Sequence, residues 1–133
     1  MIIQSPTGKG IRSDPAGDGH FGASRGSRIH NGADFECVPD QLVTCPIESG
    51  VLVRESRPYA DDSRYKGVVI RSDRIHIKMF YCEVLDRLVG TKVRQSQPIA
   101  VAQDISKKYG GGMKPHIHLQ IDKIDPTLLM EVD

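Results

Sequence analysis

The sequence predicts an all-β fold, a single domain built as one antiparallel sheet or a small sandwich. Short apolar runs recur from residue 33 onward, and several alternate apolar and polar residues with a period of two. Turn-forming residues separate these runs at short intervals, as in all-β domains. A helical signal is weak and confined to residues 126–132, where Asp125 offers a capping side chain and Pro126 suits a first helical turn.

The elements follow from this pattern in chain order. Residues up to about Ile29 are rich in Gly, Ser, Arg and Asp without a strand or helix period, which predicts an ordered loop that wraps another part of the molecule. We then expect strands at residues 33–37, 41–47, 50–56, 67–72, 74–85, 98–103 and 116–122. Ser49-Gly50 predicts a tight hairpin turn with a positive φ at Gly50. Gly110, Gly111 and Gly112 predict backbone freedom before the last strand.

Composition limits the function classes. The chain has 133 residues, the size of one domain, and Lys+Arg 18 against Asp+Glu 17 leaves a net charge of +1. This balance offers no basic footprint for nucleic acid. Apolar runs fall far short of the ~20 residues of a membrane span, and balanced charge with recurrent apolar runs argues against disorder. Without a repeat or linker, residues 1–133 are expected to form one domain, with residues 1–20 as an N-terminal loop segment.

The N-terminal residues and the cysteines bear on the compartment. The first residues show no long apolar region and no small-residue cleavage site, so no secretory signal is expected there. The odd number of cysteines favours a reduced compartment and free, half-buried thiols. A bridge between Cys37 and Cys45 across a hairpin is the alternative.

Two histidine-containing segments carry the chemical signal. Residues 116–121 alternate His116, His118 and Gln120 with apolar residues, which places two imidazoles side by side on one strand face. An isolated pair of this kind is most often a solvent-facing polar stripe. In the second segment, His30 and Asp34 flank Asn31-Gly32, a dipeptide that permits a tight turn and equally forms ordinary turns.

Taken together, the two segments predict a zinc site. Two imidazoles and one carboxylate suit Zn²⁺, which takes nitrogen and oxygen ligands at about 2.0–2.2 Å in four-coordinate geometry. Three protein ligands leave one position for water or a substrate carbonyl, the feature that distinguishes catalytic from structural zinc. The remaining histidine of the three would then act as a general base or a transition-state donor. A purely structural role for the histidines, with zinc contributing to folding, is the plain alternative.

The same motifs resemble a known family. The H-x-x-x-D pair in "HNGADF", the segments "LVTCPIESGVLV" and "GTKVRQSQPIAVAQ", the strand "PHIHLQI" and the closing "DPTLL" occur in the order and spacing of lysostaphin-like (LytM-type) zinc endopeptidases. These enzymes cut peptide crosslinks in bacterial cell walls, and the resemblance covers residues 21–129. It implies a groove between long loops, His30, Asp34 and His118 as zinc ligands, and His116 as the catalytic histidine.

One family residue has no counterpart. In the family, a second catalytic histidine follows a tyrosine in a Tyr-x-His motif. The corresponding residues here read "YCE", from Tyr81 to Glu83, so glutamate stands in place of that histidine. Strand parity places Glu83 on the face of Tyr81, where its carboxylate would act as a general base, and places His76 on the opposite face as a structural or surface residue.

Further residues receive smaller roles. The resemblance implies that Phe21 and Arg25, or Arg28, line the substrate groove, with surface positions as the alternative. Tyr81 and Tyr109 are candidate oxyanion donors, against the commoner role of tyrosines at the edge of a core. His20 is expected to be an exposed loop histidine that could reach the groove.

A second resemblance gives a second function. "KMFY", "PY" at residues 58–59 and "YGGGM" are similar to segments of the vertebrate leukocyte-derived chemotaxins, signalling proteins with the same fold and zinc site and no ascribed peptidase activity. The leading expectation is a zinc-dependent endopeptidase that acts on peptidoglycan peptides at the bacterial cell wall or periplasm after release or delivery. The alternative is a zinc-binding module without catalysis. The sequence does not indicate an oligomeric state.

Overall fold

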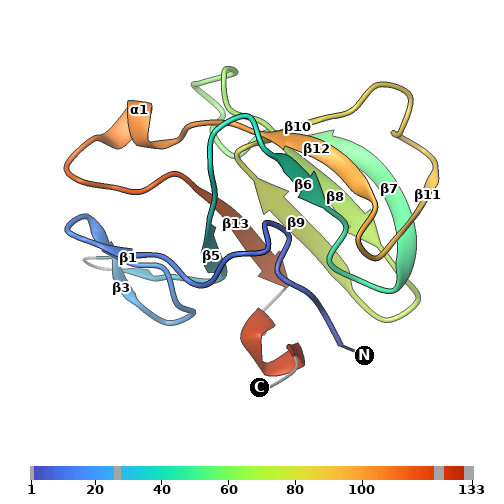
Figure 1. Cartoon of the computed structure of the whole chain (residues 1–133), viewed down its shortest axis with the longest axis horizontal. Coiled ribbons are helices and arrows are strands. Elements are labelled where there is room, and N and C mark those ends of the chain that lie inside the picture. Colours follow the sequence, from blue (N-terminus) through green and yellow to red (C-terminus); the bar gives the residue numbers. More distant parts are fainter. Residues whose placement is uncertain (1, 26–27, 122–124, 131–133) are drawn as a thin grey trace.

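The structure, a computed structural model, describes residues 2–25, 28–121 and 125–130, and it is built almost entirely from antiparallel strands (Figure 1). The larger sheet has the strand order β11-β7-β8-β9-β13-β5. Its members are β5 (Ala33–Glu36), β7 (Ser49–Ser56), β8 (Gly67–Arg71), β9 (His76–Phe80), β11 (Lys92–Arg94) and β13 (His116–Ile121). The smaller sheet has the order β10-β12-β6, formed by β6 (Leu42–Thr44), β10 (Cys82–Val84) and β12 (Pro98–Ala102). The all-β prediction is confirmed.

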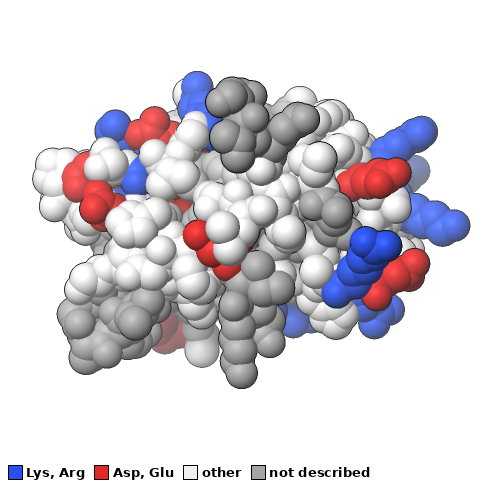
Figure 2. All heavy atoms as spheres, turned by 90° about the horizontal axis from the view of Figure 1, so that it is seen from below, with Lys and Arg blue, Asp and Glu red and all other residues white. Residues whose placement is uncertain are grey.

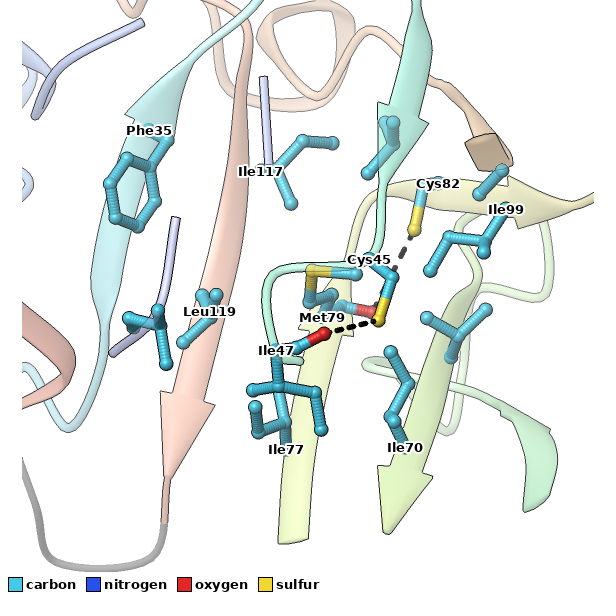
Figure 3. Close-up of a cluster of buried hydrophobic side chains, with 14 of the residues drawn as sticks. Phe35, Cys45, Ile47, Ile70, Ile77, Met79, Cys82, Ile99, Ile117 and Leu119 are labelled. Carbon is cyan, nitrogen blue, oxygen red and sulfur yellow. Dashed lines mark hydrogen bonds between the residues drawn. The ribbon is translucent and has the colours of Figure 1, made fainter. Parts of the chain in front are cut away.

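The hydrophobic core lies between these two sheets. Alternate residues of β9 and β13 are fully buried on the core side, among them Ile77, Met79, Ile117 and Leu119. Figure 3 shows them facing side chains from around the smaller sheet, including Cys45, Cys82 and Ile99. Burial of this apolar surface supplies the main driving force for folding and leaves the polar residues of β13 on the other face of the large sheet.

The cysteines are part of this core. Cys37, Cys45 and Cys82 are free and buried, so the expectation of free thiols holds and the alternative Cys37–Cys45 bridge is not formed. Burial raises the pKa of the Cys37 and Cys82 thiols to about 12, which keeps both protonated.

Three details of the strands differ from the prediction. The predicted strand 74–85 is divided into β9 and β10, because Tyr81 adopts a φ of 76° and breaks the alternation. Ser49 and Gly50 belong to β7 rather than to a hairpin turn. Gly50 is required for close packing instead, since a Cβ there would lie 2.9 Å from Cγ2 of Ile70. Strand β11 was not expected, because Val93 is its one buried residue in a polar stretch.

The N-terminal segment contains two short hairpins that lie beside β5 and β13 (Figure 1): β1 (Ser13–Asp14) with β2 (Gly17–Asp18), and β3 (Ser24–Arg25) with β4 (Arg28–Ile29). The segment packs beside these strands as expected, but the short strands within it were not predicted. Helical turns occur at α1 (Ser106–Tyr109), which was not expected, and at η1 (Pro126–Leu129), where Asp125 caps the backbone N–H of Thr127 as expected. The glycines at 110–112 all have positive φ.

The surface carries charges of both signs. Figure 2 shows one face on which most of the described Lys, Arg, Asp and Glu side chains lie toward the two ends, with an acidic group near the middle. At the end that holds β7 and β11, basic and acidic side chains alternate rather than form one patch. None of the described helices has the length and apolar character needed to span a bilayer.

Candidate metal centre

The polar face of the large sheet brings three strands together at one point. His118 on β13 pairs with Asp34 on β5 and with Phe80 on β9, so the three side chains stand in a row on one face. The His118 ring stacks on Phe80 with centroids 5.4 Å apart. Gly32 makes room for this ring, because a Cβ at that position would lie 2.6 Å from Cε1 of His118. Gly32 therefore serves close packing.

Three buried ligand atoms converge at this point. Nδ1 of His118 lies 2.9 Å from Oδ1 of Asp34 and 3.0 Å from Nε2 of His30, and the last two atoms are 3.2 Å apart. Ligand atoms around a tetrahedral ion with bonds of about 2.0–2.2 Å lie roughly 3.3–3.6 Å apart, so small outward shifts would accommodate zinc. The three side chains together could hold a metal ion.

Each imidazole is oriented by its other nitrogen. Nδ1 of His30 lies 3.0 Å from the backbone carbonyl oxygen of His20 and donates its proton there, which leaves Nε2 free as a ligand. Nε2 of His118 lies 3.2 Å from Oε1 of Gln120, which leaves Nδ1 toward Asp34. When neither Nε2 of His30 nor Nδ1 of His118 carries a proton, unshared electron pairs converge with the carboxylate on one point, an arrangement that a cation stabilises.

The charge on Asp34 is stabilised within the site. Burial by itself would raise the pKa of this carboxyl, but before a metal binds, His118 and His30 can donate ring protons to it, and these hydrogen bonds hold the pKa well below its usual range. Asp34 is therefore ionised, the state that metal coordination requires. The guanidinium of Arg12 contacts the other oxygen of Asp34, Oδ2, at 3.3 Å.

His116 stands beside the three ligand atoms as a neutral base. Its Nε2 lies 3.6 Å from Oδ2 of Asp34, and its Nδ1 lies 2.8 Å from the backbone carbonyl oxygen of Lys114. The proton on Nδ1 is donated to that carbonyl, so Nε2 carries the unshared pair. Burial lowers the pKa of His116, which keeps the ring neutral at pH 7.

These residues form the floor of an open cavity of about 590 Å³. Four segments form its walls. They are the N-terminal segment, the loop before β8, strand β9, and the loop before β13 that contains Gly110, Gly111 and Gly112. The lining residues are Arg12, Ala16, His30, Asn31, Asp34, Pro58, Tyr59, Phe80, Tyr81, Tyr109, Met113, His116, His118 and Gln120. Aromatic and uncharged side chains thus predominate around the two charged groups, Arg12 and Asp34.

Three tyrosines form one wall. The Tyr109 hydroxyl donates to that of Tyr59, which lies 3.0 Å from the hydroxyl of Tyr81. The Tyr81 ring meets the ring of His116 edge-on, with centroids 5.4 Å apart. Burial raises the pKa of Tyr81 to about 12, so its phenol stays protonated at neutral pH and is able to donate a hydrogen bond.

The structure brings together most of the residues that the sequence singled out. His30, Asp34 and His118 share the floor of the cavity, and His116 and Tyr81 line it. Glu83 was wrongly placed: it is absent from the described lining residues, and its side chain is 59% exposed and paired with Lys66 Nζ at 3.3 Å. The break at Tyr81 is the cause, because parity cannot be counted across a residue with positive φ.

The other candidates lie at the margin. Phe21 is partly buried and is absent from the described lining. The side chains of Arg25 and Arg28 fall outside what the structure describes. His20 is exposed and contributes its backbone carbonyl to His30. His76 is exposed as a surface residue, although the strand register places it on the face of His118, at the far end of β9.

Two residues of the site were not found from the sequence. Arg12 lies in the N-terminal loop, where a single arginine indicates a solvent-exposed cation, yet it is 2% exposed. The long-range bridge between Ile11 and Phe35 sets Arg12 beside Asp34 and accounts for this burial. Tyr59 carries no periodic signal, because it lies in the polar loop between β7 and β8.

Comparisons with known proteins give this arrangement a context. The fold is that of a lysostaphin-type peptidase domain: the chain matches the catalytic domain of the antimicrobial peptidase lysostaphin from Staphylococcus simulans with a TM-score of 0.55 and 19% identity, over 81% of each chain. Among curated sequences it is similar to leukocyte cell-derived chemotaxin-2 from Bos taurus, with 28% identity over 98% of this chain and 85% of the bovine protein. No model of a known protein family matches the chain. Both resemblances expected from the sequence are thereby confirmed.

Proposed function

We propose that this protein is a zinc-dependent endopeptidase that hydrolyses peptide crosslinks or stem peptides of bacterial peptidoglycan. One observation carries the proposal: the ligand atoms of His30, Asp34 and His118 meet on the floor of an open cavity, directly beside a neutral histidine. A structural zinc site is closed by four protein ligands, whereas three ligands in a cavity leave room for a reacting group. The lysostaphin-like fold supports peptide crosslinks of the cell wall as the substrate class.

The residues have distinct roles in this proposal. Zinc held by His30, Asp34 and His118 would polarise the carbonyl of the peptide bond and make an adjacent water easier to deprotonate. His116 accepts the proton of that water at Nε2 and later returns it to the departing amine, while Lys114 holds its Nδ1. Tyr81 donates its phenol proton in a hydrogen bond to the oxygen that becomes negative.

The cavity suits an extended, largely uncharged peptide. Its volume of about 590 Å³ falls in the range of about 300–1,000 Å³ typical of ligand sites. The two charged lining residues, Arg12 and Asp34, are engaged with each other on the floor. The walls therefore offer mainly aromatic faces and phenol hydroxyls, which pack against peptide planes and bond to their polar groups.

A second function competes with the first: a zinc-binding module for recognition or signalling, without peptidase activity. Two observations favour it. The position of the family's second catalytic histidine is taken by Glu83, whose side chain is exposed outside the cavity, so the site has His116 without that partner. The similarity to leukocyte cell-derived chemotaxin-2 also covers nearly the whole chain.

Clearing of purified peptidoglycan separates these functions. The wild type and His116→Ala are loaded with equal zinc, as checked by elemental analysis, and the turbidity of the suspension is followed. Clearing by the wild type alone, with the masses of released fragments identifying the cut bond, supports the peptidase. No clearing of several peptidoglycan types by fully zinc-loaded wild type would refute the peptidase and favour the binding module instead.

A further inference from the structure

Arg12 lies against Asp34 along the backbone as well as through its side chain. The Arg12 N–H donates to the Asp34 carbonyl at 2.8 Å, and the Asp34 N–H donates to the Gly19 carbonyl at 2.8 Å. A Cβ at Gly19 would lie 2.7 Å from Cβ of Asp34, so only glycine permits this approach. The N-terminal segment thus bonds to both the backbone N–H and the backbone carbonyl of Asp34.

The guanidinium of Arg12 joins two buried carboxylates. Its Nε and Nη2 approach Oδ2 of Asp34 at 3.4 and 3.3 Å, while its Nη1 donates to both oxygens of Asp14 at 2.9 Å. Asp14 is itself fixed, since its oxygens accept from the backbone N–H groups of Ala16 and Lys114. The planar fork of arginine suits such a bridge, which a lysine ammonium cannot reproduce.

The two oxygens of Asp34 therefore face different partners. Oδ1 faces His30 and His118, and Oδ2 faces Arg12, with Nε2 of His116 at 3.6 Å. We propose that Arg12 is a positioning residue that makes Asp34 bind the metal through one oxygen only. This inference rests on the metal site of the proposed function.

The proposal has a direct consequence for coordination. A carboxylate free to turn can bring both oxygens to one ion, which fills a position that a reacting group needs. With Oδ2 held by Arg12, the ion keeps three protein ligands and one open position. The N-terminal segment, far from β13 in sequence, would in this way set the coordination number at the site.

Cobalt(II) provides the test, because its visible absorption is intense in tetrahedral sites and several-fold weaker when the ion has five or six ligands. Wild type, Arg12→Met and Arg12→Lys are titrated with Co²⁺ to saturation, and absorbance per bound ion is recorded. The control is Arg94→Met, the same change at an exposed residue of β11, on the opposite edge of the sheet from β5. Circular dichroism checks that each variant is folded.

We expect intense absorption in wild type and Arg94→Met, a several-fold loss in Arg12→Met, and a smaller loss in Arg12→Lys, whose ammonium keeps a donor near Oδ2. Folded Arg12 variants with the wild-type spectrum would overturn the role of Arg12 and leave the metal site standing. Wild type that binds no Co²⁺ would instead refute the metal site itself. If neither Arg12 variant folds, X-ray absorption or a crystal structure of zinc-loaded wild type decides, since two Asp34 oxygens bonded to zinc would overturn the proposal and one would support it.

Discussion

Strand β13 and the segment from β9 to β10 both carry residues that the sequence predicts to be in the site. β13 places both His116 and His118 there, whereas the β9–β10 segment places Tyr81 there but not Glu83. β13 keeps strict alternation, with Ile117 and Leu119 in the core and His116 and His118 in the site. The β9–β10 segment has the same apolar and polar pattern, but the positive φ of Tyr81 interrupts it. Phe80 and Tyr81 both line the cavity as neighbours in sequence, while Glu83 emerges into solvent.

This difference shows when the alternation of apolar and polar residues predicts which face of a sheet a side chain occupies. It assigns faces reliably only along an unbroken ladder, because each further residue reverses the face. β13 is paired on both sides, by β5 and β9, and those ladders keep its register. β10 leaves the large sheet and pairs with β12, so its residues follow the smaller sheet.

Removal of a ligand on β13 should have the largest effect. His118→Ala is expected to lower zinc affinity by more than the ~10–100-fold typical of losing a partner that only orients a ligand, because one of three direct ligands is lost. Glu83→Ala is the matched change on the interrupted segment and should leave zinc affinity at the wild-type value. Competition titration with a chelating dye measures both, and equal losses in the two variants would contradict the site described above.

The same contrast should appear in thermal stability. Zinc at a thousandfold excess over its dissociation constant stabilises the folded state by about 4 kcal/mol, since it links β5, β13 and His30 only when the chain is folded. A chelator should therefore lower the melting temperature of the wild type and of Glu83→Ala by the same amount. His118→Ala should melt at one temperature with and without chelator, as followed by circular dichroism. A chelator shift that survives in His118→Ala would place the stabilising ion elsewhere.

The sequence predicted those parts of the site that depend on local pattern. The face shared by His116 and His118 follows from alternation alone, while the family pattern assigned His118 with His30 and Asp34 as the ligands. Arg12 was missed because its burial depends on contacts with residues more than 20 positions away, which no local pattern records. Glu83 was misplaced because a single backbone angle, at Tyr81, reverses the parity beyond it.

A substitution of Tyr81 measures how much the segment from β9 to β10 contributes to catalysis. Tyr81→Phe should lower peptidoglycan turnover by about 10- to 100-fold, somewhat less than the ~10²–10³-fold expected for a dedicated oxyanion donor, with zinc affinity unchanged. Tyr65→Phe is the matched control, because its buried hydroxyl donates to the Asp104 carbonyl and its side chain is absent from the described lining of the cavity. Each variant loses one hydrogen bond, which costs about 1 kcal/mol of stability. A difference in turnover between them would therefore come from a chemical role of the Tyr81 hydroxyl. Equal turnover in the two variants would assign Tyr81 to structure alone.

The smallest effect is expected at Glu83, where the sequence pattern predicted a general base. Its carboxylate is 59% exposed and its partner Lys66 is 27% exposed, so solvent screens the pair and Glu83→Gln should change the free energy of unfolding by less than ~0.5 kcal/mol. Because the side chain does not line the cavity, turnover of peptidoglycan and zinc affinity should both stay at wild-type values. A loss of turnover at unchanged zinc loading would mean that β10 rearranges when substrate binds, and that the interrupted segment, like β13, delivers a proton-transfer group to the metal.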